Sequence, residues 1–318
     1  MRKPSSSAAR RSTSHARGER WPAPGQLDLS IGPPAPAHLS YISDMTGFGH
    51  SVAAPGRILV AGDWHGNRHW AVNVIRRIPQ VLAGEERPLI LHLGDFGIWP
   101  GDDGRRYLGT VSAALAEQGA ELWFVDGNHE DFTQLGSLGR GMLPDGRVPV
   151  LPGIYHLPRG YRWGWHGRRW LACGGGVSLD RASRREGRDW WPQEEITGEQ
   201  EAALIGAGVA DVMVCHDCPA AVAHSFPRPP AEWDPADLRR NETHRARLQR
   251  ITDAVRPRYL MHGHLHRAYQ RDCHFGFGPV QVTGLATDGT LANFAVLDVA
   301  SMAWWPSRRR MLRRKALA

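Results

Sequence analysis

Five short apolar runs dominate the sequence, and each one ends on polar residues of the kinds that bind metal ions. The runs do not alternate between polar and apolar residues, so they suit strands that are buried on both faces of a helix-covered sheet. Ligands in such sheets bind beyond the carboxyl ends of the strands, which predicts that the five polar clusters converge on one site. The runs with their polar ends are 57-RILVAGDWHGN-67, 88-PLILHLGDF-96, 121-ELWFVDGNHE-130, 211-DVMVCHD-217 and 258-RYLMHGHLH-266.

The segments between these runs predict helices. Apolar residues recur at helical spacing between His69 and Leu82, and residues 107–117 form a second amphipathic stretch. A third helix is expected over residues 235–255, with Asp234 as its N-cap and a proline in its first turn. Strands and helices in alternation are typical of a layered α/β domain.

A second group of short segments predicts a second sheet. Residues 155–173 are rich in aromatic side chains and favour an antiparallel hairpin with a turn at residues 166–167. Further short apolar segments follow near the end of the chain, at 268–274, 280–282 and 291–299. We expect these segments to pack as a sheet on the first one, so the fold class is α/β, a two-sheet β-sandwich flanked by helices.

Charge divides the chain into an acidic body and two basic ends. The formal net charge is +7, of which residues 1–20 contribute +5 and residues 307–318 contribute +6, so the residues between them carry a net −4. Residues 1–55 are rich in Ser, Pro, Gly and Arg without an apolar period, which predicts a disordered N-terminal extension. We expect one folded domain over residues 56–300 and a basic C-terminal tail over residues 301–318.

The same composition limits the partners that we expect. The basic ends leave room for nonspecific contacts with nucleic-acid phosphates, whereas the acidic body gives no support to a nucleic-acid-binding core. No stretch approaches the roughly 18 apolar residues of a membrane-spanning helix, so no membrane partner is expected. No apolar segment follows Arg10 and Arg11, which argues against an export signal and favours a cytoplasmic protein. Translation from Met45 would give a shorter chain that still contains all five clusters.

The polar clusters offer carboxylate, imidazole and amide oxygen donors but no thiolate. That mixture favours Mn²⁺, with Fe or Zn²⁺ as alternatives. Seven donors are too many for one ion with about four to six ligands, so two ions that share a bridging carboxylate fit better. Such a pair keeps a net positive charge and suits an anionic phosphoryl group, because two metals can activate a water and clamp the oxygens of an in-line displacement. The candidate donors are Asp63, His65, Asp95, Asn128, His216, His264 and His266.

The order of the clusters, D-x-H, G-D, G-N-H-[DE], H and G-H-x-H, resembles that of the calcineurin-like metallophosphoesterase superfamily over about residues 57–298. The resemblance implies a four-layer αββα fold. It also implies a hydrolase of phosphate mono- or diesters with two divalent metal ions, in which a metal-activated hydroxide attacks phosphorus in line. Residues 56–300 would then be the catalytic domain, with a phosphorylated molecule as the substrate.

The resemblance also assigns roles to individual residues. The first metal would take Asp63, His65 and His266, the second would take Asn128, His216 and His264, and Asp95 would bridge both. His129 is not a metal ligand in this pattern. It would face the substrate, where it can protonate the leaving oxygen or stabilise developing charge. Glu130 would either orient His129 or close the start of a helix.

Departures from the family pattern bear on the substrate. The Asp-Arg-Gly of the Ser/Thr protein phosphatase branch is absent after Asp95, which weakens an assignment to that branch. Arg184 or Arg188 could neutralise substrate phosphates, and Trp190 and Trp191 could stack on a base; the alternative is a solvated basic loop pinned by buried indoles. Two other functions stay open, a nucleic-acid-processing phosphodiesterase or nuclease, and a catalytically silent binding module on the same fold.

Overall fold

The computed structural model describes residues 53–223 and 233–305 of the 318-residue chain. Residues 1–52 of the expected disordered extension and residues 306–318 of the expected basic tail lie outside these residues. The folded domain extends past the predicted end at residue 300, because Ala303–Trp305 form a strand that pairs with Val296–Asp298. Among the helices that the structure describes, none combines the length and the apolar character needed to cross a membrane.

The first sheet has seven strands in the order β13-β12-β1-β2-β3-β5-β4. Its central strands β1, β2, β3 and β5 are parallel to one another, and the strands on either side of them pair in antiparallel fashion. The strands are β1 (Arg57–Ala61), β2 (Leu89–His92), β3 (Glu121–Phe124), β4 (Val148–Leu151), β5 (Ile154–His156), β12 (Phe294–Asp298) and β13 (Ala303–Trp305).

The second sheet has six strands in the order β10-β11-β9-β8-β7-β6. Its strands β11, β9, β8 and β7 are parallel, and an antiparallel strand lies at each edge. The strands are β6 (Arg162–Trp165), β7 (Arg168–Cys173), β8 (Val212–Cys215), β9 (Tyr259–His262), β10 (Tyr269–Phe275) and β11 (Gly278–Gly284).

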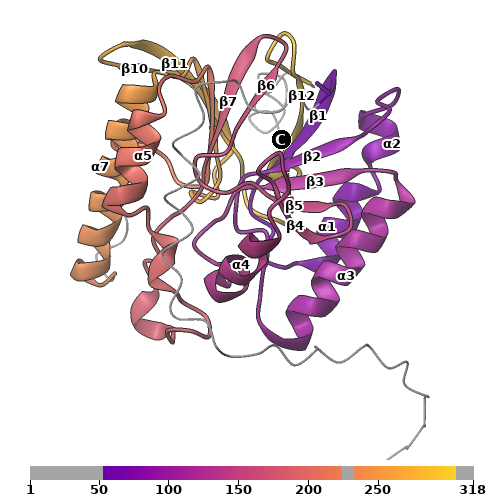
Figure 1. The fold of residues 1–318 in the computed structure, drawn as a ribbon, viewed down its shortest axis with the longest axis horizontal. Helices are drawn as coiled ribbons and strands as arrows, with labels where there is room; N and C mark the ends of the chain where they lie inside the picture. The colour runs from indigo at the N-terminus through magenta and orange to yellow at the C-terminus, as the bar shows by residue number, and fades with distance from the viewer. Residues whose placement is uncertain (1–52, 224–232, 306–318) are drawn as a thin grey trace, which may run out of the picture. The chain divides into compact units, whose positions relative to one another are not determined.

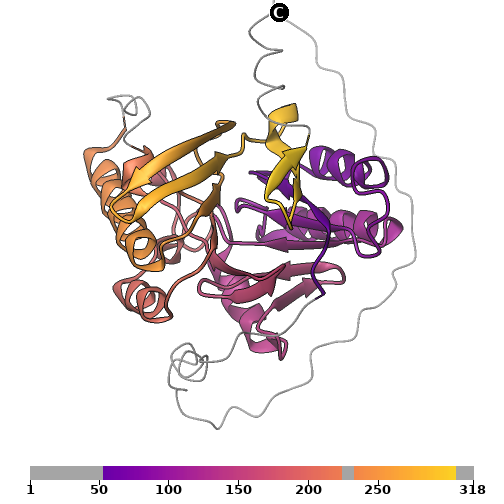
Figure 2. The ribbon, with the colours of Figure 1, turned by 90° about the horizontal axis from the view of Figure 1, so that it is seen from above.

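Helices cover the outer face of each sheet, as Figures 1 and 2 show. Helices α1, α2 and α3 pack on the first sheet, and α5 and α7 pack on the second. The helices are α1 (Arg68–Ile75), α2 (Ile78–Val81), α3 (Gly101–Glu117), α4 (Phe132–Leu138), α5 (Gly198–Gly206), α6 (Ala220–Ala223) and α7 (Pro235–Val255). Short 3₁₀ turns lie at Gly139–Gly141, Arg181–Ser183, Pro192–Glu194 and Leu291–Asn293.

Three apolar cores separate these layers. The middle core joins the facing sides of the two sheets, for example Val60 and Leu91 from the first sheet with Trp170 and Val214 from the second. The other two cores lie between each sheet and its helices. The order of layers is therefore helix, sheet, sheet, helix, and the predicted α/β sandwich is confirmed.

The five apolar runs form strands as predicted, but they belong to two different sheets. Strands β1, β2 and β3 lie in the first sheet, whereas β8 and β9 lie in the second. Two segments expected in the second sheet are instead in the first: residues 154–156 form β5, and residues 294–298 form β12. The prediction was wrong there because apolar content indicates a buried strand and does not say which sheet it joins.

All three predicted helical segments are helical but partly differ in extent, and the structure has three further helices, α4, α5 and α6, that the sequence did not indicate. The helix expected between His69 and Leu82 is divided into α1 and α2, and Pro79 explains the break because it lacks an amide hydrogen and clashes with the carbonyl four residues earlier. Helix α3 begins at Gly101, earlier than predicted. Helix α7 has the predicted bounds, and Oδ1 of Asp234 caps it by accepting the N–H of Ala236 at 2.7 Å.

Candidate metal centre

The polar ends of strands from both sheets meet at one place. Asp63 and His65 follow β1, Asp95 follows β2, and Asn128 and His129 follow β3. From the second sheet, His216 follows β8, and His264 and His266 follow β9. Short distances between donor atoms join all eight residues, so the convergence predicted from the strand ends is present.

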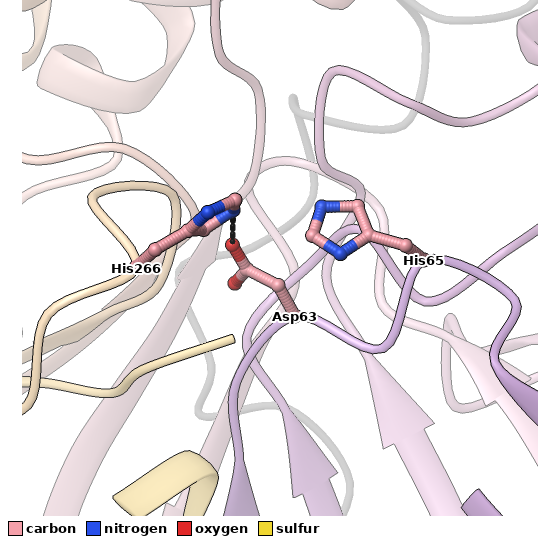
Figure 3. Close-up of side chains that lie close together, drawn as sticks. All are labelled: Asp63, His65 and His266. Atoms are coloured by element: carbon pink, nitrogen blue, oxygen red, sulfur yellow. Dashed lines mark ion pairs between the residues drawn. The ribbon is translucent and has the colours of Figure 1, made fainter. Parts of the chain in front are cut away.

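The first group of donors consists of Asp63, His65 and His266 (Figure 3). Oδ2 of Asp63 lies 3.0 Å from Nε2 of His266, and the rings of His65 and His266 meet edge-on with centroids 5.1 Å apart. One donor atom from each residue lies within 4.8 Å of the other two, a spacing that allows one cation to contact all three. Asp63 is fully buried, whereas His266 is exposed.

The second group lies around His216. Asp95, His216 and His264 also offer donor atoms within 4.8 Å of one another. Oδ1 of Asn128 lies 3.0 Å from Nε2 of His216, which adds an amide oxygen to this group. Nδ1 of His216 lies 2.8 Å from the carbonyl oxygen of Leu93, an acceptor that requires hydrogen on Nδ1 and leaves Nε2 for a cation.

Asp95 stands between the two groups. Its Oδ2 atom lies 3.3 Å from Nε2 of His65 in the first group and 3.4 Å from Nε2 of His216 in the second. The side chain is almost completely buried. A carboxylate in this position can serve both groups at once.

His129 lies beside the same carboxylate. Its Nε2 atom is 3.9 Å from Oδ2 of Asp95, and its backbone N–H donates to Oδ1 of Asp95 at 2.9 Å. Together with His65 and Asp95 it forms a third group of close donor atoms, so distance alone does not separate it from the metal-binding candidates. Burial lowers the pKa of His129, and the nearby guanidinium of Arg184 lowers it further.

Backbone strain is concentrated at these positions. Among the described residues, seven non-glycine residues have a positive φ, and four of them are His65, Asp95, His264 and His266. The left-handed region costs a non-glycine residue about 1–3 kcal/mol, and such strain is typical of functional sites. The strained backbone at these four residues therefore lowers the stability of the fold while it places their side chains in the donor cluster.

The charge balance of the cluster favours a cation. The ion pairs that the described residues make with Asp63 and Asp95 are all with histidines. Burial lowers the pKa of His65, but Asp95 and Asp63 outweigh it and raise the pKa to about 9. Burial acts likewise on His216, and Asp95 raises its pKa to about 10. Two buried carboxylates with imidazole and amide donors thus fit divalent cations in both charge and ligand type.

Two carboxylates that the sequence analysis did not identify lie next to histidines of the cluster, one beside His65 and one beside His264. Oδ1 of Asp288 lies 3.5 Å from Nδ1 of His65, and the amide of Asn67 donates to the other oxygen of Asp288 at 2.6 Å. Oδ2 of Asp217 lies 3.9 Å from Nε2 of His264, and Arg245 binds this carboxylate at 3.0 Å. Carboxylates in such positions orient metal-binding imidazoles. Asp288 is distant in sequence from every cluster, and its spacing carried no signal.

Glu130 has neither of the two roles proposed for it from the sequence. It is fully buried, and its carboxylate accepts the backbone N–H groups of Phe96, Gly97 and Ile98 at 2.7, 3.1 and 2.7 Å. The neighbouring Asp131 caps helix α4 instead. Burial raises the pKa of Glu130 to about 7 despite the three N–H donors. Glu130 therefore holds the loop that follows Asp95.

The tryptophans of the basic loop after β7 fit the interpretation in which buried indoles pin the loop, and not the one in which they stack on a base. Trp190 and Trp191 are buried, and Arg181 and Arg240 lie over the ring of Trp190, so the indoles are not available to stack on a base. Arg184 is near enough to His129 to affect its pKa, and Asp180 binds its guanidinium at 2.8 Å. Arg188 is exposed, and no described side-chain contact connects it to the cluster.

One family of known proteins matches most of the chain. Residues 56–268 match the family model of the calcineurin-like phosphoesterases. Among solved structures, the chain is similar to TT1561 of Thermus thermophilus, at 13% identity and a TM-score of 0.46 over 79% of this chain and 97% of that one. It is also similar to the sulfate thiohydrolase SoxB of Thermus thermophilus, at 15% identity and a TM-score of 0.37 over 75% of this chain and 40% of that one. A comparison with curated proteins finds no match.

Proposed function

The chain belongs to the calcineurin-like phosphoesterase family, and from that premise we propose that it hydrolyses phosphate mono- or diesters with two divalent metal ions. The observation that carries the proposal is the position of Asp95, whose Oδ2 atom is nearly equidistant from His65 and His216. All seven donors that the sequence indicates contribute to this arrangement, which argues against a catalytically silent binding module.

The first ion would be held by Asp63, His65 and His266, and the second by His216, His264 and the amide oxygen of Asn128, with Asp95 shared. We propose Mn²⁺ for both positions, with Fe or Zn²⁺ as alternatives, because the donors are oxygens and imidazoles without a thiolate. When bound, the two ions would supply Lewis acidity toward the phosphoryl oxygens and lower the pKa of a water toward roughly 7.

The chain's own side chains would complete the chemistry. His129 lies next to the donors and 22% of its side chain is exposed, so a substrate bound at the donors can contact it. There it would protonate the leaving oxygen or donate a hydrogen bond to a phosphoryl oxygen. Arg184 would add positive charge near the same point, although its ion pair with Asp180 reduces what it can offer to a phosphate. Burial of the carboxylates keeps water away from their charges.

Hydrolysis of two chromogenic esters tests the proposal. The purified protein is stripped of metal, supplied with Mn²⁺, and assayed on p-nitrophenyl phosphate and bis-p-nitrophenyl phosphate, the first a monoester and the second a diester. We expect turnover of at least one ester with Mn²⁺ and none after chelation. Absence of turnover on both esters with Mn²⁺, Fe and Zn²⁺ would contradict the proposal. The nuclease alternative depends on the basic ends of the chain and is not part of it.

A further inference from the structure

Asn128 can bind a metal in only one of the two orientations of its side-chain amide. Its side-chain amide has an oxygen that can contact a cation and a nitrogen that cannot. A rotation of 180° exchanges the two with almost no change in shape, so the surrounding hydrogen bonds must determine which atom faces the cluster. Whatever binds the nitrogen of Asn128 therefore controls whether the second group of donors is complete.

A short buried chain of hydrogen bonds binds this nitrogen. Nδ2 of Asn128 donates to Oγ of Ser178 at 3.1 Å, and Oγ of Ser178 donates to Oε2 of Glu194 at 2.6 Å. The backbone N–H of Ser178 donates to the other carboxylate oxygen of Glu194 at 3.0 Å. All three side chains are buried, with no more than 2% of their surface exposed.

The chemistry of the groups fixes the direction of every bond in this chain. An ionised carboxylate can only accept, so the single hydroxyl hydrogen of Ser178 is used by Glu194. The oxygen of Ser178 must then accept from its other neighbour, which is the amide nitrogen of Asn128. The amide oxygen is left on the opposite side, where it lies 3.0 Å from Nε2 of His216.

Helix α7 anchors the far end of the chain. Nη2 of Arg240 donates to Oε1 of Glu194 at 3.2 Å, and the same guanidinium binds Glu195 at 2.6 Å and Asp237 at 3.0 Å. Burial raises the pKa of Glu194, whereas the hydrogen bonds from Ser178 and the guanidinium of Arg240 favour its ionised form, the form on which the direction of the bonds depends. The anchor belongs to the helical layer behind the second sheet and touches none of the candidate donors directly.

We propose that Ser178 and Glu194 are positioning residues that hold the amide oxygen of Asn128 toward the cluster and so set the affinity for the second metal ion. The inference rests on the proposed function only in requiring that two ions bind. Ser178 and Glu194 lie in the loop between β7 and α5, outside the five sequence clusters. Neither is a metal donor, and both act through Asn128.

Calorimetric titration with Mn²⁺ tests the inference without measuring catalysis. The variant Ser178→Ala removes the acceptor for Nδ2, and we expect one of the two Mn²⁺ sites to weaken by about 10–100-fold while the other keeps its affinity. Ser178→Thr keeps a hydroxyl and should restore the weakened site. Ser183→Ala is the matched control, since it removes an exposed hydroxyl from the same loop that binds only the backbone carbonyl of Asp180.

The variant Glu194→Gln tests the direction of the bonds without changing side-chain volume. The new amide nitrogen can donate to Ser178, which frees the hydroxyl hydrogen for Asn128 and favours the reversed amide. We expect the same site to weaken as in Ser178→Ala, with the melting temperature of each apo-protein recorded so that a loss of fold is recognised. A variant that unfolds is replaced by Ser178→Cys, a weaker acceptor of similar size, for which a smaller loss at the same site is expected.

Three results would overturn the inference. They are unchanged affinity at both sites in folded Ser178→Ala, equal weakening of both sites, and failure of Ser178→Thr to restore the affinity. The outcome is independent of the proposed hydrolysis. A wild-type protein that binds two ions and hydrolyses nothing would refute the proposed function but not the positioning role of Ser178 and Glu194. A wild-type protein that does not bind two ions would refute both the function and the positioning role.

Discussion

A Cβ atom added at Gly127 would lie 2.1 Å from Oδ1 of Asp95 and 2.3 Å from its backbone nitrogen. Real Cβ atoms do not approach other atoms so closely, so any side chain at position 127 must displace Asp95 or the loop that carries it. The glycine that opens the G-N-H-E cluster after β3 thus makes room for the carboxylate that follows β2. Two clusters that are separate in sequence depend on each other in space.

Replacing Gly127 by alanine should therefore damage the metal centre rather than β3. We expect Gly127→Ala to lower kcat/KM by about 10²-fold or more, because displacements near 1 Å at a reacting centre have that effect. Gly136→Ala is the matched control, since a Cβ there has no neighbour within 4 Å and the residue lies in helix α4. The control should keep full activity and gain about 0.5–1 kcal/mol of stability. Equal activity in the two variants would show that the contact with Asp95 has no effect.

The three backbone N–H groups bound by Glu130 predict a cost for its amide analogue. Glutamine offers one acceptor oxygen where glutamate offers two, so Glu130→Gln must leave at least one buried N–H of the loop at 96–98 facing a nitrogen. We expect the free energy of unfolding to fall by about 1–3 kcal/mol in denaturant titrations. The exposed Glu117 at the end of α3 provides the control, and Glu117→Gln should change stability by less than about 0.5 kcal/mol. A Glu130→Gln variant as stable as this control would contradict the assignment.

A variant of His129 distinguishes a role in catalysis from a role in metal binding. We expect His129→Asn to keep two Mn²⁺ ions per chain and to lower kcat by about 10²–10⁴-fold on an alkyl phosphate. The loss should be smaller on an aryl phosphate, because p-nitrophenolate needs little protonation as it leaves.

Each alternative role of His129 has its own result. Equal losses on alkyl and aryl substrates would argue for stabilisation of charge at the phosphoryl oxygens. Loss of a metal ion from His129→Asn, measured by elemental analysis, would make His129 a ligand, as its place beside Asp95 and His65 also allows.

The contacts of residues 55 and 56 define where the N-terminal segment can be removed. The carbonyl oxygen of Pro55 accepts from Nε2 of His166 at 2.9 Å, and the N–H of Gly56 donates to Glu85 at 3.0 Å. We expect deletion of residues 1–52 to leave activity and the melting temperature nearly unchanged, since those residues lack the apolar surface needed to dock. Deletion of residues 1–60 should unfold the protein, because β1 pairs with both β12 and β2. A fall of many degrees in the shorter deletion would show that a folded element was lost.

The sequence predicted the centre better than its surroundings, for physical reasons. Strands that are buried on both faces are recognisable in a sequence as continuous apolar runs. Ligands of such sheets bind beyond the carboxyl ends of the strands, so the sequence alone placed Asp63, Asp95 and His216 at one site. Pro79, which separates α1 from α2, is a break that the sequence itself contains. Whether a run joins one sheet or the other depends on packing between distant segments, which is why β5 and β12 were assigned to the wrong sheet.

The residues that surround the candidate donors and hydrogen-bond with them could not be predicted from the sequence. Ser178, Glu194 and Asp288 reach the candidate donors through loops whose paths depend on the whole fold, and each is an ordinary loop residue when read alone. For the two tryptophans after the basic loop, the sequence left open either a surface that stacks on a base or buried indoles that pin the loop. The structure supports the second alternative, because both indoles are buried and Arg181 and Arg240 lie over the ring of Trp190.

Counting the metal ions bound to Asp95 variants examines whether this carboxylate bridges two metals. Elemental analysis after loading with Mn²⁺ and removal of free ions should give two ions per wild-type chain. Asp95→Asn should lose both, because the shared carboxylate lies within 3.4 Å of a histidine from each group, whereas His266→Ala should mainly weaken the first site. Two ions retained by a folded Asp95→Asn variant would contradict the assignment of Asp95 as the bridge between two metals.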